Sequence, residues 1–225
     1  MKTALKISAF LMVFLAFAAC KDKAKGTAAK TEAAKEAPKT TITEFTTYPV
    51  NSGTLNWIGS KAIGDSHQGT IQISDGKLGV GADGQIKAGS FTIDMNSITT
   101  TDLEAGKGKE KLEGHLKNED FFDVGKFPTG TFNIIKVEPV SGVTDVTHSV
   151  IGNLTLKGVK KSITIPANIA IANGKISAVT PSFTINRTDW GIQYGSGTFF
   201  DNLGDKVIND DIALVLQLEA TAPAN

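Results

Sequence analysis

Residues 152–165 read GNLTLKGVKKSITI, and the spacing of apolar residues in this stretch decides the fold. Apolar side chains stand at every second position in Leu154, Leu156, Ile163 and Ile165. Successive side chains of a β-strand point to opposite faces, so this spacing gives each strand one apolar face. Gly152 and Gly158 bracket the first run, and glycines at strand ends permit the bulges and bends of a closed sheet. The stretch therefore predicts two β-strands whose leucines and isoleucines point inward.

The same alternation recurs along the rest of the chain from residue 44 onward. It is found in Leu55/Trp57, Ile71/Ile73, Phe91/Ile93/Met95, Phe132/Ile134, Phe183/Ile185 and Ile212/Leu214/Leu216/Leu218. Turn-forming residues divide these runs, for example Asn173-Gly174 and Gly195-Ser196-Gly197. About eight strands with this spacing predict an all-β fold, namely an antiparallel sandwich or barrel.

One stretch, residues 101–122, interrupts the alternation. Thr101 and Glu104 fit a capping box, in which each side chain accepts a hydrogen bond from a backbone N–H at a helix start. Leu112 and Leu116 are four apart and share one helical face. Three glycines weaken any helix here. We expect a short helical insertion between two strands, lying across one end of the barrel.

The N-terminus has the pattern of a secretory signal peptide over residues 1–19. Two lysines precede a short apolar run, and two alanines stand directly before Cys20. The run is too short for a membrane-spanning helix, which needs about 20 apolar residues. The order small-small-Cys resembles the lipobox of bacterial lipoproteins, in which the cysteine is acylated and becomes the new N-terminus. The alternative is ordinary secretion with a free thiol, which would be reactive in an oxidising compartment.

Residues 20–43 are predicted to be the lipidated cysteine followed by a flexible tether. Residues 21–43 are rich in Ala, Lys, Thr and Glu, contain no aromatic residue, and have one large aliphatic residue, Ile42. Such a segment buries too little apolar surface to offset the entropy of ordering it. The barrel domain is then expected over residues 44–222. An acylated Cys20 would place the protein in the bacterial cell envelope, anchored in the outer membrane.

Composition and motifs give no support for catalysis, metal binding or nucleic-acid binding. The chain has 23 basic and 23 acidic side chains, so it lacks the basic field of a nucleic-acid binder. One cysteine allows no disulfide, so the fold depends on its hydrophobic core. His67, His115 and His148 stand in different predicted elements, and none forms a metal-spaced pair. No nucleophile-elbow GxSxG motif is present. We therefore expect no catalytic residue, no cofactor and no metal.

The inward faces are the candidate ligand-binding surface. An eight-stranded barrel is either filled by its own side chains or holds one small ligand. Alternation alone leaves both alternatives open. The candidate lining residues are Trp57, Phe91, Ile93, Phe132, Leu154, Leu156, Phe183, Ile185, Leu214 and Leu216.

Three segments together resemble the YceI-like family of bacterial secreted proteins. They are NEDFFD (118–123) with the following Phe127-Pro128, GNLTLKGVKK (152–161) and FTINRTDWGI (183–192). The stretch DMNSITT (94–100) is also similar to that family, and the resemblance covers roughly residues 44–222. Trp190 stands where the family often has phenylalanine. Arg187 and Asp189, two apart in the third segment, are expected in a strand with a structural role.

The resemblance implies a lipocalin-like antiparallel β-barrel with an elongated apolar cavity that binds an isoprenoid or similar long-chain lipid. It implies no catalytic apparatus. The leading hypothesis is thus a lipid-anchored polyisoprenoid-binding protein, serving in storage, transport or envelope stress. The alternative is a cavity-free barrel that acts as a protein-interaction or structural module. An enzyme would need a carboxylate or histidine inside the cavity with a strongly shifted pKa. The ligand's length and the oligomeric state remain open at this point.

Overall fold

The barrel wall is built from strands whose apolar residues recur at every second position, as the sequence predicts. The structure, a computed structural model, describes residues 25–36 and 45–223. The long strands are β3 (Phe45–Ser60), β4 (Ser66–Gly81), β5 (Ile86–Thr100), β6 (Thr129–Pro139), β7 (His148–Leu156), β8 (Val159–Ala172) and β11 (Asp211–Thr221). The short elements are β1 (Thr27–Ala28), β2 (Lys30–Ala33), α1 (Lys109–Lys117), β9 (Lys175–Val179), β10 (Phe183–Asn186), and the 3-10 helices η2 (Arg187–Trp190) and η3 (Gly204–Lys206).

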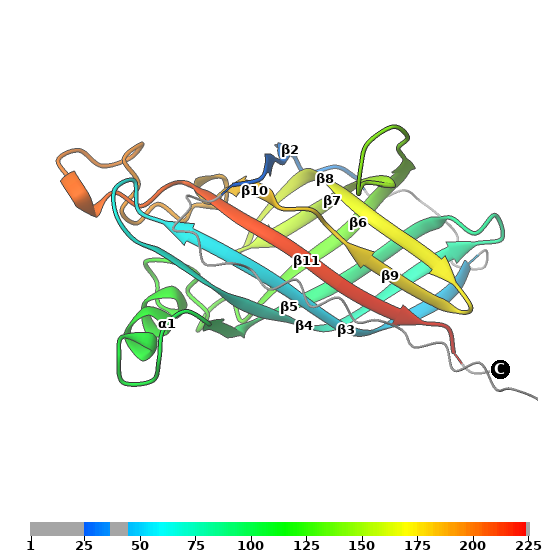
Figure 1. Cartoon of the computed structure of the whole chain (residues 1–225), viewed down its shortest axis with the longest axis horizontal. Coiled ribbons are helices and arrows are strands. Elements are labelled where there is room, and N and C mark those ends of the chain that lie inside the picture. Colours follow the sequence, from blue (N-terminus) through cyan, green and yellow to red (C-terminus); the bar gives the residue numbers. More distant parts are fainter. Residues whose placement is uncertain (1–24, 37–44, 224–225) are drawn as a thin grey trace, which may run out of the picture.

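Antiparallel pairing runs around the wall in the order β11-β3-β4-β5-β6-β7-β8. Strand β9 closes the barrel because it pairs with both β8 and β11. Strand β10 follows β9 along the same edge of β11, so the two together fill one position in the wall. Eight wall positions result, which confirms the prediction of an antiparallel β-barrel of about eight strands with a short helical insertion (Figure 1).

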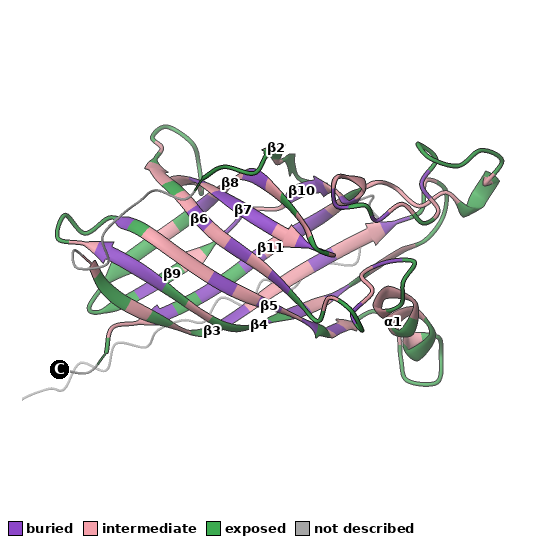
Figure 2. Cartoon of the chain, turned by 180° about the vertical axis from the view of Figure 1, so that it is seen from behind, coloured by how far each residue is buried: buried purple, intermediate pink, exposed green. Residues whose placement is uncertain are grey.

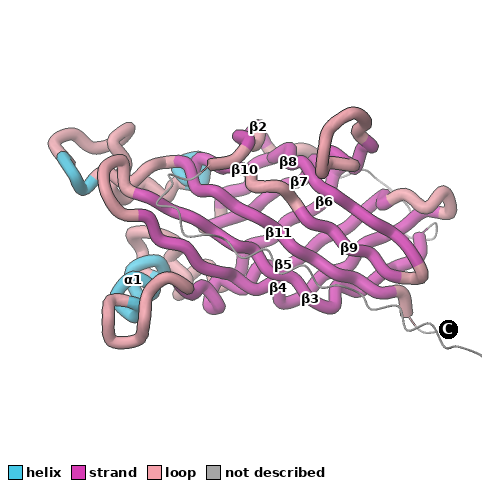
Figure 3. The backbone as a smooth tube through the Cα atoms, in the orientation of Figure 1, coloured by secondary structure: helices cyan, strands magenta, loops and turns pink. Residues whose placement is uncertain are grey.

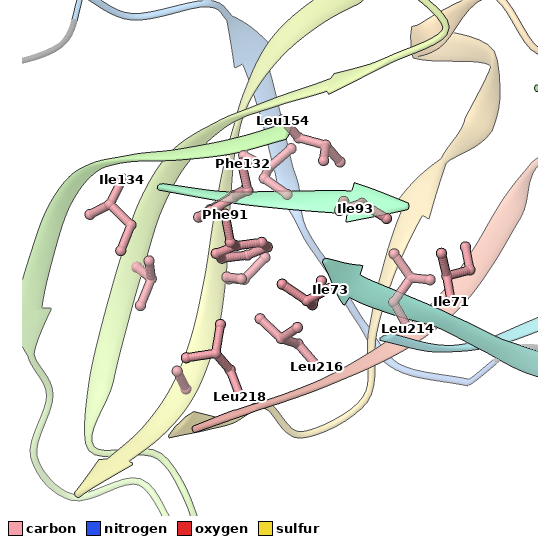
Figure 4. Packing of buried hydrophobic residues seen from close by; sticks show 14 of the residues in the cluster. Ile71, Ile73, Phe91, Ile93, Phe132, Ile134, Leu154, Leu214, Leu216 and Leu218 are labelled. Atoms are coloured by element: carbon pink, nitrogen blue, oxygen red, sulfur yellow. The ribbon is translucent and has the colours of Figure 1, made fainter. Parts of the chain in front are cut away.

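The core fills the inside of the barrel. Buried and less buried residues alternate over much of the long strands (Figure 2), because one face of each strand points inward. Side chains from different strands of the wall meet inside the barrel, as Phe91 of β5, Ile73 of β4 and Leu216 of β11 show in Figure 4. Trp190 from η2 is completely buried and adds to this core from beyond the end of β10. The inward orientation of the residues in the alternating runs is confirmed.

Helix α1 and the loops that carry η3 extend from one end of the elongated barrel, while the β8–β9 hairpin lies at the other (Figures 1 and 3). Leu112 and Leu116 on α1 pack against the core from that end. Within the described ranges, no helix is long and apolar enough to cross a membrane.

The start of the helical insertion was predicted wrongly. No helix begins at Thr101; the first helical residue is Lys109, and its N-cap is Gly108 with a φ of 102°. Residues 101 and 102 instead extend the β4–β5 pairing, because the N–H of Thr101 donates to the carbonyl of Gln68 and the N–H of Gln68 donates to Asp102. Thr101 could either cap a helix or bond to the edge of the sheet. The outcome depends on Gln68 of β4, which is distant in sequence and so does not enter a local prediction.

Two other local interpretations are corrected. Gly152 lies in the middle of β7 rather than at its end, although Gly158, with a φ of 75°, does occupy the following turn. Arg187 and Asp189 lie in the 3-10 helix η2 and not in a strand. Arg187 is buried and pairs with Asp210 at 3.3 Å between Nη2 and Oδ1, so its role in holding the neighbouring loop is structural.

The N-terminal segment also differs from the flexible tether predicted over residues 20–43. Its residues 25–36 lie against the barrel, where β1 pairs with β10 and β2 pairs with β8. The composition of this segment did favour disorder, but the free edges of β8 and β10 supply hydrogen-bonding partners for its backbone. Residues 1–24, which include Cys20 and the predicted signal peptide, and residues 37–44 lie outside the described residues.

Candidate apolar ligand site

A small internal cavity lies in the half of the barrel that contains β9. Its volume is about 40 Å³. The lining side chains come from β4, β5, β6, β7, β8, β11, β9 and the residue that follows β9. They are Leu78, Ile86, Phe91, Phe132, Ile134, Val137, Val150, Ile165, Ala167, Ile169, Ala178, Thr180, Leu216 and Leu218.

The cavity wall is apolar apart from one hydroxyl group. The rings of Phe91 and Phe132 stack with their centroids 5.2 Å apart and an interplanar angle of 23°. Thr180 is the one polar lining residue, and its Oγ1 accepts a hydrogen bond from the N–H of Leu216 at 2.9 Å. Such a wall offers dispersion contacts and no charge, which suits a hydrocarbon and excludes a strongly polar ligand.

Of the ten candidate residues, Phe91, Phe132 and Leu216 line this cavity. The other seven belong to the same buried core but do not line it: Trp57, Ile93, Leu154, Leu156, Phe183, Ile185 and Leu214. Most of these seven occupy the half of the barrel nearer α1. Their role in ligand binding stays a prediction.

Several lining residues were not selected from the sequence. Ile134, Ile165 and Leu218 stand in runs that the period of two identifies, so the pattern contained a signal for them. Leu78 and Ile86 flank the turn between β4 and β5, and nothing in their local sequence marks them as lining a cavity. An inward residue borders the cavity only if the side chains from the other strands leave space beside it. That depends on the packing of the whole closed barrel and not on local sequence.

Two tryptophans, Trp57 and Trp190, belong to the buried core but do not line the cavity. Trp190 donates from its indole Nε1 to the carbonyl of Leu154 at 3.1 Å. The ring of Trp57 lies so close to Gly69 that a Cβ built there would come 2.6 Å from Cζ2. Among the described residues, Nε1 of Trp57 has no hydrogen-bond partner, although it is buried. A buried, unpaired N–H is costly to the folded state.

The titratable groups lie outside the cavity. Nδ1 of His67 is 2.8 Å from Asp102, and Nε2 of His115 is 3.1 Å from Asp120. Burial raises the pKa of Asp102, but hydrogen bonds from Thr100, His67 and the N–H of Gln68 outweigh it and lower that pKa below its ordinary value. Burial lowers the pKa of His148. In the described part of the chain, no group of three or more metal-ligating side chains is present.

Comparison with known sequences finds one matching family. The YceI-like domain matches residues 39–220. A UPF0312 protein of Pseudomonas paraeruginosa is 35% identical over 111 residues, which cover 47% of this chain and 52% of that protein. Protein YceI of Salmonella arizonae is 37% identical over 80 residues, covering 36% of each chain. The chain thus spans about half the length of the first of these relatives and less of the second.

Two solved structures share the fold. BcnA of Burkholderia cenocepacia superposes with a TM-score of 0.58 and 19% identity, covering 75% of this chain and 96% of that one. A polyisoprenoid-binding domain from Saccharophagus degradans superposes with a TM-score of 0.55 and 18% identity, covering 80% of this chain and 100% of that one. Neither superposition includes the whole of this chain. At sequence identities this low, the likeness concerns the fold alone.

Proposed function

The chain belongs to the YceI-like family, and from this premise we propose that it binds an isoprenoid or similar long-chain apolar lipid inside its barrel. The observation that carries the proposal is the closed interior, whose cavity is lined by thirteen apolar side chains and one threonine. Support also comes from the fold shared with a polyisoprenoid-binding domain of Saccharophagus degradans. No charged side chain is among the described residues that line the cavity, so affinity would come from burying hydrocarbon.

The cavity must enlarge for such a ligand to enter. Ligand pockets commonly measure about 300–1,000 Å³, whereas this cavity measures about 40 Å³. Enlargement would require rotation of large side chains such as Phe91 and Phe132, or movement of the wall. Strand β9 is a candidate for that movement because it is only five residues long.

We further propose that Cys20 carries a lipid anchor and holds the protein in the bacterial cell envelope, at the outer membrane. The support is the sequence of residues 1–20 alone. Labelling of growing cells with a fatty-acid analogue tests the anchor: the wild-type chain should become labelled and Cys20→Ser should not. Equal labelling of both would refute acylation at Cys20.

Binding, rather than catalysis, is the proposed activity. Among the described residues that line the cavity there is no carboxylate or histidine, and His67 and His115 are partly exposed outside it. General acid-base chemistry needs such groups within hydrogen-bond reach of a substrate. A bound hydrocarbon in this cavity would meet none.

Native mass spectrometry tests lipid binding directly. The full chain carrying Cys20→Ser would be purified without detergent and measured before and after organic extraction, then with added polyprenol. A stoichiometric lipid removed by extraction, or uptake of the polyprenol, is the expected result. A protein that carries no lipid and does not bind added polyprenol would favour the second candidate, a packed barrel that acts as an interaction module. The small volume of the cavity is the observation that supports this second candidate.

A further inference from the structure

The barrel wall is interrupted between β8 and the chain that joins β9 to β10. Strand β9 pairs with β8 only from Asn168 onward, and no pairing joins β8 to β10 in the described residues. On the β8 side, residues 165–167 pair with β7 but with neither β2 nor β9, and Pro166 among them has no N–H to donate to a neighbouring strand. We name this interruption the seam.

The seam lies directly beside the cavity. Ile165 and Ala167 on β8 and Thr180 after β9 all line the cavity, and all three belong to the edges of the seam. Beside these residues, no direct strand pairing joins β8 to the chain that follows β9 in the described residues. A lipid entering here would cross one layer of side chains rather than the length of the barrel.

Residues 25–36, here named the strap, cover the seam. Strand β1 pairs in parallel with β10, where the N–H of Thr27 donates to Ser182 and the N–H of Ala29 donates to Thr184. Strand β2 pairs with β8 over Lys30–Ala33. The strap thus bonds to both edges and completes the wall, as the blue segment beside β8 and β10 shows in Figure 1.

The strap continues across the outer face of the wall and ends at a polar side chain. Asn153 on β7 is buried, its Oδ1 accepts from the N–H of Lys35 at 3.0 Å, and its Nδ2 donates to the carbonyl of Lys35. Ser162 on β8 lies between Asn153 of β7 and Glu32 of β2, its register partners on the two neighbouring strands. Its side chain is buried, and its hydroxyl has no hydrogen-bond partner in the described chain. These outward-facing polar groups would be hydrated without the strap, so its departure exposes little apolar surface there.

Few apolar contacts hold the strap. Ala29 is its one residue that packs against the core in the described chain, and the side chain is small. The ion pairs of Glu32 with Lys30 and Lys35 join parts of the strap to each other and not to the wall. Segments held by exposed backbone hydrogen bonds and little apolar burial open locally before the whole protein unfolds. The strap also precedes residues 39–220, which match the family.

We propose that the seam is a lateral portal for the lipid and that the strap is its removable cover. Detachment of residues 25–36 opens the wall beside Ile165, Ala167 and Thr180, and the strap closes again over the occupied barrel. This inference rests on the proposed lipid-binding function and adds to it the route of entry.

A disulfide that fixes the strap to β8 tests the portal. Lys30 and Thr164 are paired residues on adjacent antiparallel strands, a geometry that accepts a disulfide. The full chain with Cys20→Ser would carry Lys30→Cys and Thr164→Cys. Uptake of a fluorescent polyprenol from phosphatidylcholine vesicles would be followed with the disulfide oxidised and then reduced. The matched control carries Thr54→Cys and Gln72→Cys, which join β3 to β4 away from the seam.

We expect uptake by the oxidised strap variant to be at least about tenfold slower than by its reduced form, because entry requires the local opening. The control should show no dependence on oxidation. Equal uptake rates by the oxidised and reduced strap variant would overturn the portal, since the lipid then enters with the strap in place.

Failure of the proposed function gives a different result. If neither the wild type nor any variant binds polyprenol, lipid binding itself is refuted and the seam is no lipid portal.

Amide hydrogen exchange separately tests the removable cover in the unlinked protein. The N–H groups of Ala29 and Lys35 should exchange faster than the N–H groups that form the hydrogen bonds between β7 and β8. Exchange only at the rate of global unfolding would overturn the removable strap, with or without lipid.

Discussion

Gly152 lies beneath the ring of Phe132: a Cβ built on Gly152 would stand 2.2 Å from Cζ of Phe132. Phe132 lines the cavity and stacks on Phe91, so the absence of a side chain at Gly152 makes room for this pair. We predict that Gly152→Ala costs roughly 1–3 kcal/mol of stability, because the ring must leave its position in a packed core. Urea denaturation measures this loss. An unchanged midpoint would mean that the ring yields freely.

Gly114 provides the matched control, since the same substitution there should have the opposite sign. It lies inside α1, and a Cβ added to it would have no heavy atom within 4 Å apart from its chain neighbours and the helix backbone. Gly114→Ala is expected to stabilise the protein by about 0.5–1 kcal/mol through helix propensity. Destabilisation by Gly114→Ala would show that α1 moves and that the helix environment is misjudged.

The alternation of apolar residues was enough to predict an antiparallel all-β fold with one inward face on each strand, because strand orientation is a local property. The choice of a barrel over a sandwich came from the resemblance to the YceI-like family. Leu154, Ile163 and Phe91 point inward as their spacing requires. The cavity was not predictable in this way. Leu78 borders it and Ile93 does not, although both are buried on inward faces. The difference depends on which side chains meet across the closed barrel.

The strap shows a different limit of sequence reasoning. Residues 27–33 contain no large apolar side chain, so composition alone favours a disordered tether. Their order comes from partners that are distant in sequence, namely the free edges of β8 and β10 and the amide of Asn153. The absent capping box at Thr101 has the same cause, because Gln68 on β4 is the competing partner.

Filling the cavity should weaken lipid binding without unfolding the barrel. Ala178 on β9 lines the cavity, so Ala178→Leu places additional carbon atoms where a ligand would lie. We predict at least about a tenfold loss of polyprenol affinity, or about 1.4 kcal/mol. Titration with a fluorescent polyprenol measures it. Ala172→Leu, at an exposed position of β8, serves as the control and should bind normally. Equal affinities of the two variants would place the ligand elsewhere.

Protonation of Glu113 should loosen α1 from the barrel. Glu113 accepts hydrogen bonds from the hydroxyl of Thr99 at 2.6 Å and the N–H of Thr100 at 3.0 Å, so the helix is joined to β5. The Thr99 hydrogen bond is the main cause that lowers the pKa of Glu113 below its ordinary value of 4.5, and burial opposes it. Since the folded pKa is depressed, this stabilisation is present above pH 4.5 and is lost as the pH falls through the folded value.

Hydrogen exchange of the α1 amides, measured as the pH is lowered, checks this prediction. Exchange rates corrected for intrinsic pH dependence should rise at acid pH in the wild type, and Glu113→Gln should show the raised rate already at neutral pH. Glu104→Gln removes an exposed ion pair with Lys107 and should behave as the wild type. Identical profiles for Glu113→Gln and the wild type would mean that other contacts hold α1.

Trp190 should contribute through its N–H as well as through its size. The residue is completely buried, and Nε1 donates to the carbonyl of Leu154 on β7, linking η2 to the wall. Trp190→Phe keeps an aromatic ring but removes the donor and leaves space. We expect a loss of about 1–3 kcal/mol, measured by urea denaturation, since a buried carbonyl loses a partner and a cavity forms. Tyr194→Phe removes a hydroxyl from a side chain that is 43% exposed, so it should change stability little. Equal stability of Trp190→Phe and the wild type would show that the core closes around the smaller ring and that the Leu154 carbonyl finds another donor.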